Sequence, residues 1–168
     1  MIKLFDKDMN EVIVDQDTYQ TKIFPLDNFS SFAFIMNGLK FNTSEHAFQY
    51  LKFSNTSILT AEAIKDSYSP YDARELAHKY RQYRRADWAD VKYEMMEKVI
   101  KLKIEYNPTV KQALLDTGDY IIAECCKDED TDWGLDRNYK GENHLGKILM
   151  KIRYELKKEL ENETVIRR

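Results

Sequence analysis

The sequence predicts an α+β protein that is predominantly α-helical, with about six to seven helices, a short N-terminal β-hairpin and a few small strands. Three observations carry this prediction. Beyond residue 43, apolar residues recur at spacings of three and four, as amphipathic helices require. Only 3 prolines and 5 glycines interrupt the 168 residues. Near the N-terminus, Asn37-Gly38 separates two short apolar runs, which is a strong hairpin signal.

Local signals mark where each element begins and ends. Residues 42–44 offer an N-cap for one helix, Ser69 precedes a proline that suits the first position of another, and Asp87 precedes the longest. Asn107-Pro108 ends that helix and opens the next. Strands are expected at 3–6, 11–15, 32–36 and 39–41, and a buried strand at 119–126. Helices are expected at 44–53, 59–66, 70–82, 88–106, 108–117 and 143–161, with a polar loop at 127–142.

The two longest predicted helices each show an apolar stripe that should face a core. Such a stripe arises when apolar residues return to one side of the helix every three or four positions. In the segment 88–106 it comprises Val91, Met95, Val99, Leu102 and Tyr106, and in the last helix Leu145, Ile148, Leu149, Ile152 and Leu156.

Length and composition predict one soluble globular domain at 1–160, followed by a frayed tail at 161–168. Hydrophobic residues make up 43% of the chain and charged residues 33%, which argues against global disorder. The net charge is −3, from 26 Lys and Arg against 29 Asp and Glu. A broad basic surface for nucleic acid is therefore not expected.

Cysteine and histidine usage gives no support for a metal site or a cofactor. The 2 cysteines, Cys125 and Cys126, are adjacent, which disfavours a disulfide between them. There are only 3 histidines and no CxxC pair. The N-terminus lacks the long apolar core of a signal peptide, and no apolar run is long enough to span a membrane. We therefore expect a cytoplasmic protein without membrane partners, and its oligomeric state is left open.

The segment TSEHAFQYLKF, residues 43–53, contains a polar stripe. If it is helical, Glu45, Gln49 and Lys52 fall at i, i+4 and i+7 on one face, among several aromatic residues. One interpretation is structural: with Asn42 as N-cap, Glu45 completes a capping box and Lys52 complements the helix dipole. The other is an active site, in which a desolvated lysine becomes a nucleophile and a glutamate moves protons. Spacing alone favours the structural interpretation.

Two further segments are candidates for binding. The loop at 130–146 is longer than most connectors and carries Trp133, which offers a stacking face for a base. Backbone amides at 141–145 could meet an anion at the start of the last helix. The alternative is a polar connector in which the tryptophan covers the core. The other segment contains Arg81, Arg84 and Arg85, which could bind phosphates but more commonly would mark a solvated helix end.

Four segments in order carry a specific pattern. They are FPLDNFSSFAFIMNGLKFNTSEHAFQYLKF, SPYDARELAHKYR, ADWADVKYEMMEKVIKLKIEYNPTVKQALLDTGD and WGLDRNYKGENHLGKILMKIR, within residues 24–153. The motif T-x-E-H-x-x-Q-x-x-K-F combined with a closing W-G…G-x-N-x-L-G resembles the NADAR family, also called YbiA-like N-glycosidases. The resemblance covers most of the chain and implies a YbiA-like fold.

The resemblance also implies an activity. Family members cleave the bond between ribose C1 and a nitrogen, in ADP-ribosylated guanine or in phosphorylated ribosylamino-pyrimidine intermediates of riboflavin synthesis. The guanine could belong to a nucleotide or to single-stranded DNA. Direct hydrolysis, with Glu45 or Asp136 activating water, is an alternative to a covalent route through Lys52. A non-catalytic module that binds ADP-ribose or a related nucleotide is the alternative function.

Residue roles follow from the same resemblance. Lys52 is implied as the Schiff-base nucleophile and Glu45 as the acid that moves protons. The implied substrate contacts are Asn28, Phe29, Gln49, Trp133, Gly134 and Asn143. The sequence departs from the family near an expected aspartate, so Asp136 or Asn138 fills that position, depending on the register.

Overall fold

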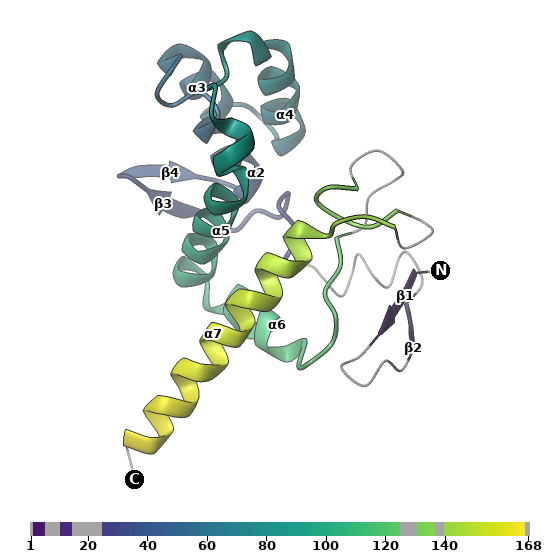
Figure 1. The fold of residues 1–168 in the computed structure, drawn as a ribbon. Helices are drawn as coiled ribbons and strands as arrows, with labels where there is room; N and C mark the ends of the chain where they lie inside the picture. The colour runs from purple at the N-terminus through teal and green to yellow at the C-terminus, as the bar shows by residue number, and fades with distance from the viewer. Residues whose placement is uncertain (1, 6–10, 15–24, 125–130, 137–139, 167–168) are drawn as a thin grey trace. The chain divides into compact units, whose positions relative to one another are not determined.

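The computed structural model describes residues 2–5, 11–14, 25–124, 131–136 and 140–166, and it confirms the predicted class (Figure 1). Two antiparallel hairpins are present in these ranges, together with six α-helices. The strands are β1 (Ile2–Phe5), β2 (Glu11–Val14), β3 (Phe34–Met36) and β4 (Leu39–Phe41). The helices are α2 (Ser44–Leu51), α3 (Ile58–Lys65), α4 (Pro70–Lys79), the short 3-10 helix η1 (Arg81–Tyr83), α5 (Trp88–Tyr106), α6 (Pro108–Asp116) and α7 (His144–Ile166).

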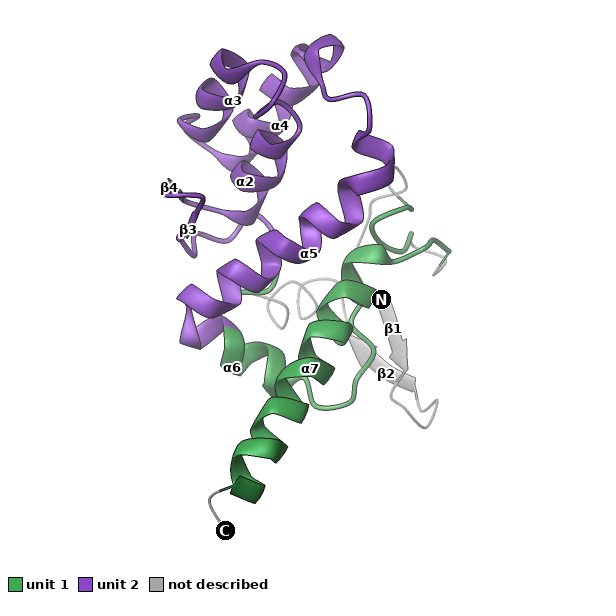
Figure 2. Cartoon of the chain, turned by 60° about the vertical axis from the view of Figure 1, so that its left-hand side comes forward, with its two compact units in different colours: residues 1–26, 111–168 green, residues 27–110 purple. Residues whose placement is uncertain are grey.

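The chain divides into two compact units (Figure 2). One unit is formed by residues 27–110, which include the β3–β4 hairpin and α2 to α5. The other combines residues 1–26 with residues 111–168. The single domain expected at 1–160 stays a prediction.

The β3–β4 hairpin turns at Asn37-Gly38, as predicted. Both residues adopt positive φ, 53° and 79°, which a two-residue hairpin loop requires and which Asn and Gly tolerate best. The register pairs Phe34 with Phe41 and Met36 with Leu39. The rings of Phe34 and Phe41 stack with their centroids 6.2 Å apart, and both are buried. The hairpin thereby contributes one edge of the hydrophobic core of the 27–110 unit.

Helix α2 lies inside the 27–110 unit, where it packs against α3, α4, α5 and β4. All 8 of its residues are buried, including the polar ones. Thr43 is the N-cap, because its side-chain oxygen accepts the backbone N–H of His46. Glu45 is therefore the second residue of the helix, and the capping box predicted with Asn42 as N-cap is wrong. The helix ends at Leu51, two residues before its predicted end at 53.

Of the N-caps predicted for α4 and α5, only that of α4 forms its side-chain hydrogen bond. Ser69 caps α4 by accepting the backbone N–H of Asp72, with Pro70 in the first position, as predicted. Asp87 does occupy the N-cap position of α5, but its side chain makes no capping bond. Instead the carboxylate accepts two hydrogen bonds from the Arg85 guanidinium, at 2.6 and 2.7 Å. For a carboxylate, a guanidinium is a stronger partner than a backbone N–H of the helix start, because its planar fork can donate two hydrogen bonds at once.

The buried face of α5 differs from the predicted stripe. Of the five residues in that stripe only Val99 is buried, and Tyr106 is exposed. The buried face is rotated relative to the predicted stripe and includes Lys103, a charged residue that a hydrophobic pattern does not place in a core. The residues that face the core are Trp88, Met96, Val99, Ile100, Lys103 and Ile104.

In the other unit, α7 presents the predicted apolar stripe to the core through Leu145, Ile148, Leu149 and Ile152. Two basic residues farther along the helix hold the turn that follows α6. The Arg153 guanidinium donates to Thr117 Oγ1 and to the Tyr120 carbonyl, at 2.7 and 2.8 Å. Lys157 Nζ donates to the Gly118 carbonyl at 2.7 Å. The helix continues to Ile166 instead of ending near residue 161, so the tail is helical that far.

The strand predicted at 119–126 is wrong for its described part, because residues 120–124 have no regular structure. The side-chain amide of Asn143 occupies the backbone groups that a strand partner would pair. Its Nδ2 donates to the Ile122 carbonyl at 2.9 Å, and its Oδ1 accepts the Glu124 N–H at 3.1 Å. Residues 125 and 126 lie outside the described residues.

Gly146 makes this arrangement possible, since a Cβ at this position would lie 2.1 Å from the Ile122 carbonyl oxygen. We expect Gly146→Ala to lower the free energy of unfolding by about 2 kcal/mol or more, because backbone must move to relieve the clash. Urea denaturation followed by circular dichroism measures this change. Lys147→Ala, at the exposed neighbouring position, serves as control. A Gly146→Ala protein as stable as the control would contradict the close approach.

Candidate active site

Glu45 and Gln49 form a buried hydrogen-bonded pair on α2. Gln49 Nε2 donates to Glu45 Oε1 at 2.8 Å, across one helical turn. The exposed fractions are only 7% for Glu45 and 4% for Gln49, so the carboxylate is held away from bulk water. A buried carboxylate is costly unless it is hydrogen-bonded, and the amide supplies that bond. The predicted stripe of Glu45 and Gln49 is therefore an internal feature and not a surface one.

Lys52 follows directly after α2 and keeps a helical backbone conformation, with φ −66° and ψ −22°. Seven residues after Glu45, it falls on the same side of the helix. The side chain is half-buried, and its Nζ lies 5.3 Å from the centroid of the Phe48 ring and 5.5 Å from that of Trp88. These two rings pack together with centroids 4.9 Å apart. The amine is thus held against an aromatic wall that limits its contact with water.

Trp88 is a site residue that sequence reasoning missed. Trp88 is 5% exposed. It is the first residue of α5 and follows directly after the arginine-rich segment. The backbone N–H of Arg85 donates to the Lys52 carbonyl at 2.9 Å, which ties this segment to the end of α2. The available signal was the ADW triplet within one of the matched segments. Spacing along the chain could not reveal that it faces Lys52.

Asn28 and Phe29 lie in a tight turn that also contacts α2. The Asn28 carbonyl accepts the Glu45 N–H at 2.9 Å, and so satisfies an amide of the first helical turn. Asp27 Oδ1 accepts the backbone N–H groups of Phe29 and Ser30, at 2.9 and 2.8 Å. The predicted contacts Asn28 and Phe29 are therefore held by a local hydrogen-bond network next to the predicted acid.

Lys103 holds this turn from α5, a role that the sequence analysis did not predict. Its Nζ donates to the Asp27 carbonyl at 2.7 Å and to Ser30 Oγ at 3.0 Å, and the side chain is 1% exposed. Burial lowers the pKa of Lys103 to about 8, and the nearby Asp27 charge opposes part of that change. A buried lysine with two hydrogen bonds thus holds the turn that contains Asn28 and Phe29 next to the start of α2.

Three buried side-chain oxygens near Glu45 have no hydrogen-bond partner among the described residues: Ser44 Oγ, Asn28 Oδ1 and Gln49 Oε1. The last two belong to side-chain amides. The amide nitrogens of the same side chains are engaged, that of Asn28 with the Met96 sulfur at 3.6 Å and that of Gln49 with Glu45. A buried acceptor without a donor costs about 1–3 kcal/mol, so such atoms are candidates for ligand contacts.

The other predicted contacts belong to the unit formed by residues 1–26 and 111–168. Trp133 and Asp136 are partly buried and Gly134 is buried. Two hydrogen bonds join Asp136 and Lys140: the Lys140 N–H donates to Asp136 Oδ1, and the Asp136 N–H donates to the Lys140 carbonyl, both at 2.9 Å. Asn138 lies outside the described residues. That these residues complete one site with Lys52 stays a prediction.

The anion site predicted at the start of α7 is wrong for residues 142–145. Their backbone N–H groups are all donated within the loop, in order to the carbonyls of Thr131, Gly134, Asp132 and Trp133. Asn143 likewise uses both ends of its side-chain amide on residues 122–124. Its backbone has a φ of 51°, in the left-handed region that asparagine tolerates. These bonds give Asn143 a positioning role in this loop, and its predicted substrate contact stays untested.

The remaining candidates are used structurally. His46 bonds to Thr43 Oγ1 at 2.8 Å and to the Ser67 carbonyl at 3.2 Å. Burial lowers its pKa, although the bond to Ser67 opposes that change, so the ring is neutral at physiological pH. Arg85 is engaged by Asp87, which favours the structural interpretation of the arginine segment.

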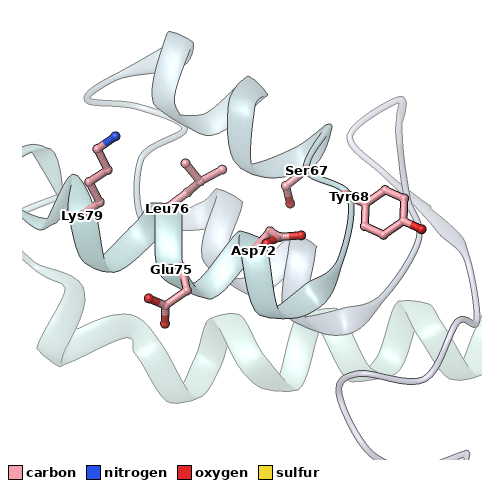
Figure 3. A pocket seen from close by; sticks show the side chains of 6 residues that line it. All are labelled: Ser67, Tyr68, Asp72, Glu75, Leu76 and Lys79. Atoms are coloured by element: carbon pink, nitrogen blue, oxygen red, sulfur yellow. The ribbon is translucent and has the colours of Figure 1, made fainter.

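Neither a metal centre nor a membrane span emerges in the described ranges. Within them, no three His, Cys, Asp or Glu side chains are grouped so that they could hold a metal ion. Helices long and apolar enough to cross a membrane are likewise absent from this part of the chain. A surface hollow of about 470 Å³ lies along α4 and the segment before it (Figure 3). None of the predicted site residues lines it; its walls are Ser67, Tyr68, Asp72, Glu75, Leu76 and Lys79.

Comparison with known proteins agrees with this fold. The model of the NADAR domain matches residues 9–157. The N-glycosidase YbiA of Shigella boydii is 32% identical over 77% of this chain and 79% of its own length. The NMR structure of the Escherichia coli protein YbiA superposes with a TM-score of 0.72 at 29% identity, covering 86% of this chain and 81% of that one.

A longer relative is the riboflavin biosynthesis protein VVA0006 of Vibrio vulnificus. It is 32% identical over 78% of this chain, which spans only 35% of that protein's length. The family match and these relatives decide the class: the chain belongs to the NADAR domain family, among proteins named as N-glycosidases.

The lowered pKa of Lys103 makes stability depend on pH. Its folded pKa of about 8 lies below the ordinary value, so between the two values the unfolded state binds more protons. The cost of burying the ammonium is fully present below pH 8 and is relieved as the pH rises. We expect the unfolding free energy of the wild type to rise by about 2 kcal/mol relative to Lys103→Met between about pH 7.5 and 10.

Urea denaturation at a series of pH values measures this difference. Lys98→Met, on an exposed position of the same helix, is the matched control and should run parallel to the wild type. If the curves of Lys103→Met and the wild type also run parallel, the amine does not titrate as described.

Proposed function

We propose that this protein hydrolyses the C1–N bond of a ribosyl substrate, with α2 as its catalytic helix. The observation that carries the proposal is the buried Glu45–Gln49 pair on the same helical side as Lys52, whose amine packs on Phe48 and Trp88. A carboxylate and an amine in partly dehydrated surroundings are suited to move protons and to attack an electrophilic carbon. The family of named N-glycosidases supports the same reaction class.

In the proposed reaction, Lys52 acts as a nucleophile in its neutral form, after its ammonium proton has passed to Glu45. As the C1–N bond breaks, positive charge develops at C1 and the leaving nitrogen takes up a proton. The lysine nitrogen bonds to C1, the sugar ring opens, and a protonated Schiff base forms. Water then adds to C1 and releases the lysine amine, so one water is consumed for each bond cleaved. Direct attack of water activated by Glu45 is the non-covalent alternative.

The substrate we propose is a phosphorylated ribosylamino-pyrimidine of riboflavin synthesis or ADP-ribosylated guanine, the latter in a nucleotide or in single-stranded DNA. The buried acceptors Asn28 Oδ1 and Gln49 Oε1 suit the hydroxyl groups of a ribose. We further propose that Trp133 and Gly134 form a wall for the base and that Asp136 or Asn138 completes the site with Asn143. The name of the Vibrio vulnificus relative supports the riboflavin class. We propose a cytoplasmic location for this activity.

Lys52 is tested by trapping. Incubation with substrate and borohydride should reduce the Schiff base to a stable ribosyl adduct, which peptide mass spectrometry locates on Lys52. Lys52→Ala and Lys52→Arg should abolish the adduct and lower kcat at least about 100-fold, because each removes the nucleophile. Lys40→Ala, on an exposed strand position, is the control. Full activity in Lys52→Ala would rule out the covalent route.

Glu45→Gln tests the proton-transfer role with little change of shape. We expect kcat to fall by about 100- to 10,000-fold, as loss of a general acid or base does. The remaining activity should lose the pH dependence that the carboxyl imposes on the wild type. Turnover of ribosylamino-pyrimidine phosphate and of ADP-ribosylated guanine is measured across pH. Tight binding of ADP-ribose without cleavage of either substrate by the wild type would favour the non-catalytic binding module instead.

A further inference from the structure

Arg74 lies between two exposed aromatic residues near the predicted site. Its guanidinium carbon is 5.5 Å from the centroid of the Phe29 ring and 5.5 Å from that of Tyr71. Phe29 is 39% exposed and Tyr71 is 53% exposed, so the group is open to solvent. Stacking on aromatic faces orients a guanidinium while its N–H groups, which lie in its plane, stay available at the edges.

These N–H groups have no acceptor among the described residues. The contrast with two other arginines is clear, since Arg85 donates to Asp87 and Arg153 donates to Thr117 and Tyr120. The sequence explains the difference. The positions three and four residues from Arg74 on α4 are Pro70, Tyr71, Ala77 and His78, none of which is a carboxylate. Arg74 is therefore an oriented cation whose charge is not matched by its own helix.

A short chain of contacts connects Arg74 to the catalytic helix. Phe29, on which it stacks, follows Asn28, whose carbonyl accepts the Glu45 N–H. Lys103, on α5, holds the same turn through hydrogen bonds to Asp27 and Ser30. Helix α4, which carries Arg74 and Tyr71, packs directly against α2. All of these residues belong to the 27–110 unit.

We infer that Arg74, oriented by Phe29 and Tyr71, binds a phosphate group of the substrate. This inference rests on the proposed function, because both proposed substrate classes carry phosphate on or near the ribose. A planar guanidinium with unused N–H pairs matches two phosphate oxygens at once. In a chain of net charge −3, a local cation of this kind favours the approach of an anionic substrate.

The test compares phosphorylated and dephosphorylated forms of one ribosylamino-pyrimidine. Arg74→Gln should lower kcat/KM about 10- to 100-fold on the phosphorylated form, mainly through KM, and leave the dephosphorylated nucleoside nearly unchanged. Arg74→Lys should recover part of the loss. Lys79→Gln, also exposed on α4, removes an equal charge and should change neither value. Equal losses on both forms, or no loss on either, would overturn the inference.

A binding measurement separates this inference from the proposed function. Titration of ribose 5-phosphate into the wild type and Arg74→Gln, followed by calorimetry, needs no turnover. At least about tenfold weaker binding by Arg74→Gln supports the phosphate subsite even if no substrate is cleaved. Equal binding by the two proteins, or no binding by the wild type at millimolar ligand, overturns it. Lys79→Gln is again the control, and circular dichroism checks that each variant is folded.

Discussion

The structure of the 27–110 unit depends on a helix that is buried on all sides, its polar residues included. Every residue of α2 is buried, and Glu45 lies within it at 7% exposure. Such a carboxylate is tolerated only when hydrogen bonds replace its water, and Gln49 supplies one of these from the next turn. The neighbouring hairpin and α3 to α5 pack around this helix and exclude water from it. They enclose the carboxyl group of Glu45 in surroundings where hydrogen bonds and electrostatic interactions are strong.

A second buried ionisable residue, Lys103, helps to position the surroundings of Glu45. Lys103 reaches from α5 to the turn of Asp27 to Ser30, and that turn presents Asn28 to the start of α2. On the far end of the helix, Trp88 and Phe48 hold the amine of Lys52. Lys103 and Trp88 both belong to α5, so one helix contacts both ends of the segment that carries Glu45 and Lys52. The unmatched cation of Arg74 then extends the same site outward along α4.

Much of the fold was predictable because local signals are strong in this chain. The Asn37-Gly38 turn, the Ser69-Pro70 start and the helix boundary at Asn107-Pro108 each act through the backbone of a few residues. The errors share a different cause. The predicted strand at 119–126 failed because Asn143, distant in sequence, supplies hydrogen bonds to residues 122–124. The predicted face of α5 failed because a lysine is buried where a charged residue is not expected.

By itself, the sequence determined the helical class, the hairpin, and the spacing of Glu45, Gln49 and Lys52 on one helical side, since these follow from local periodicity. It also carried the family motif. Only the tertiary structure decided that this side is internal, that the distant Trp88 joins Phe48 beside Lys52, and that Lys103 holds the turn of Asp27 to Ser30. Burial and long-range contacts depend on how several elements pack together, and no short segment encodes that packing.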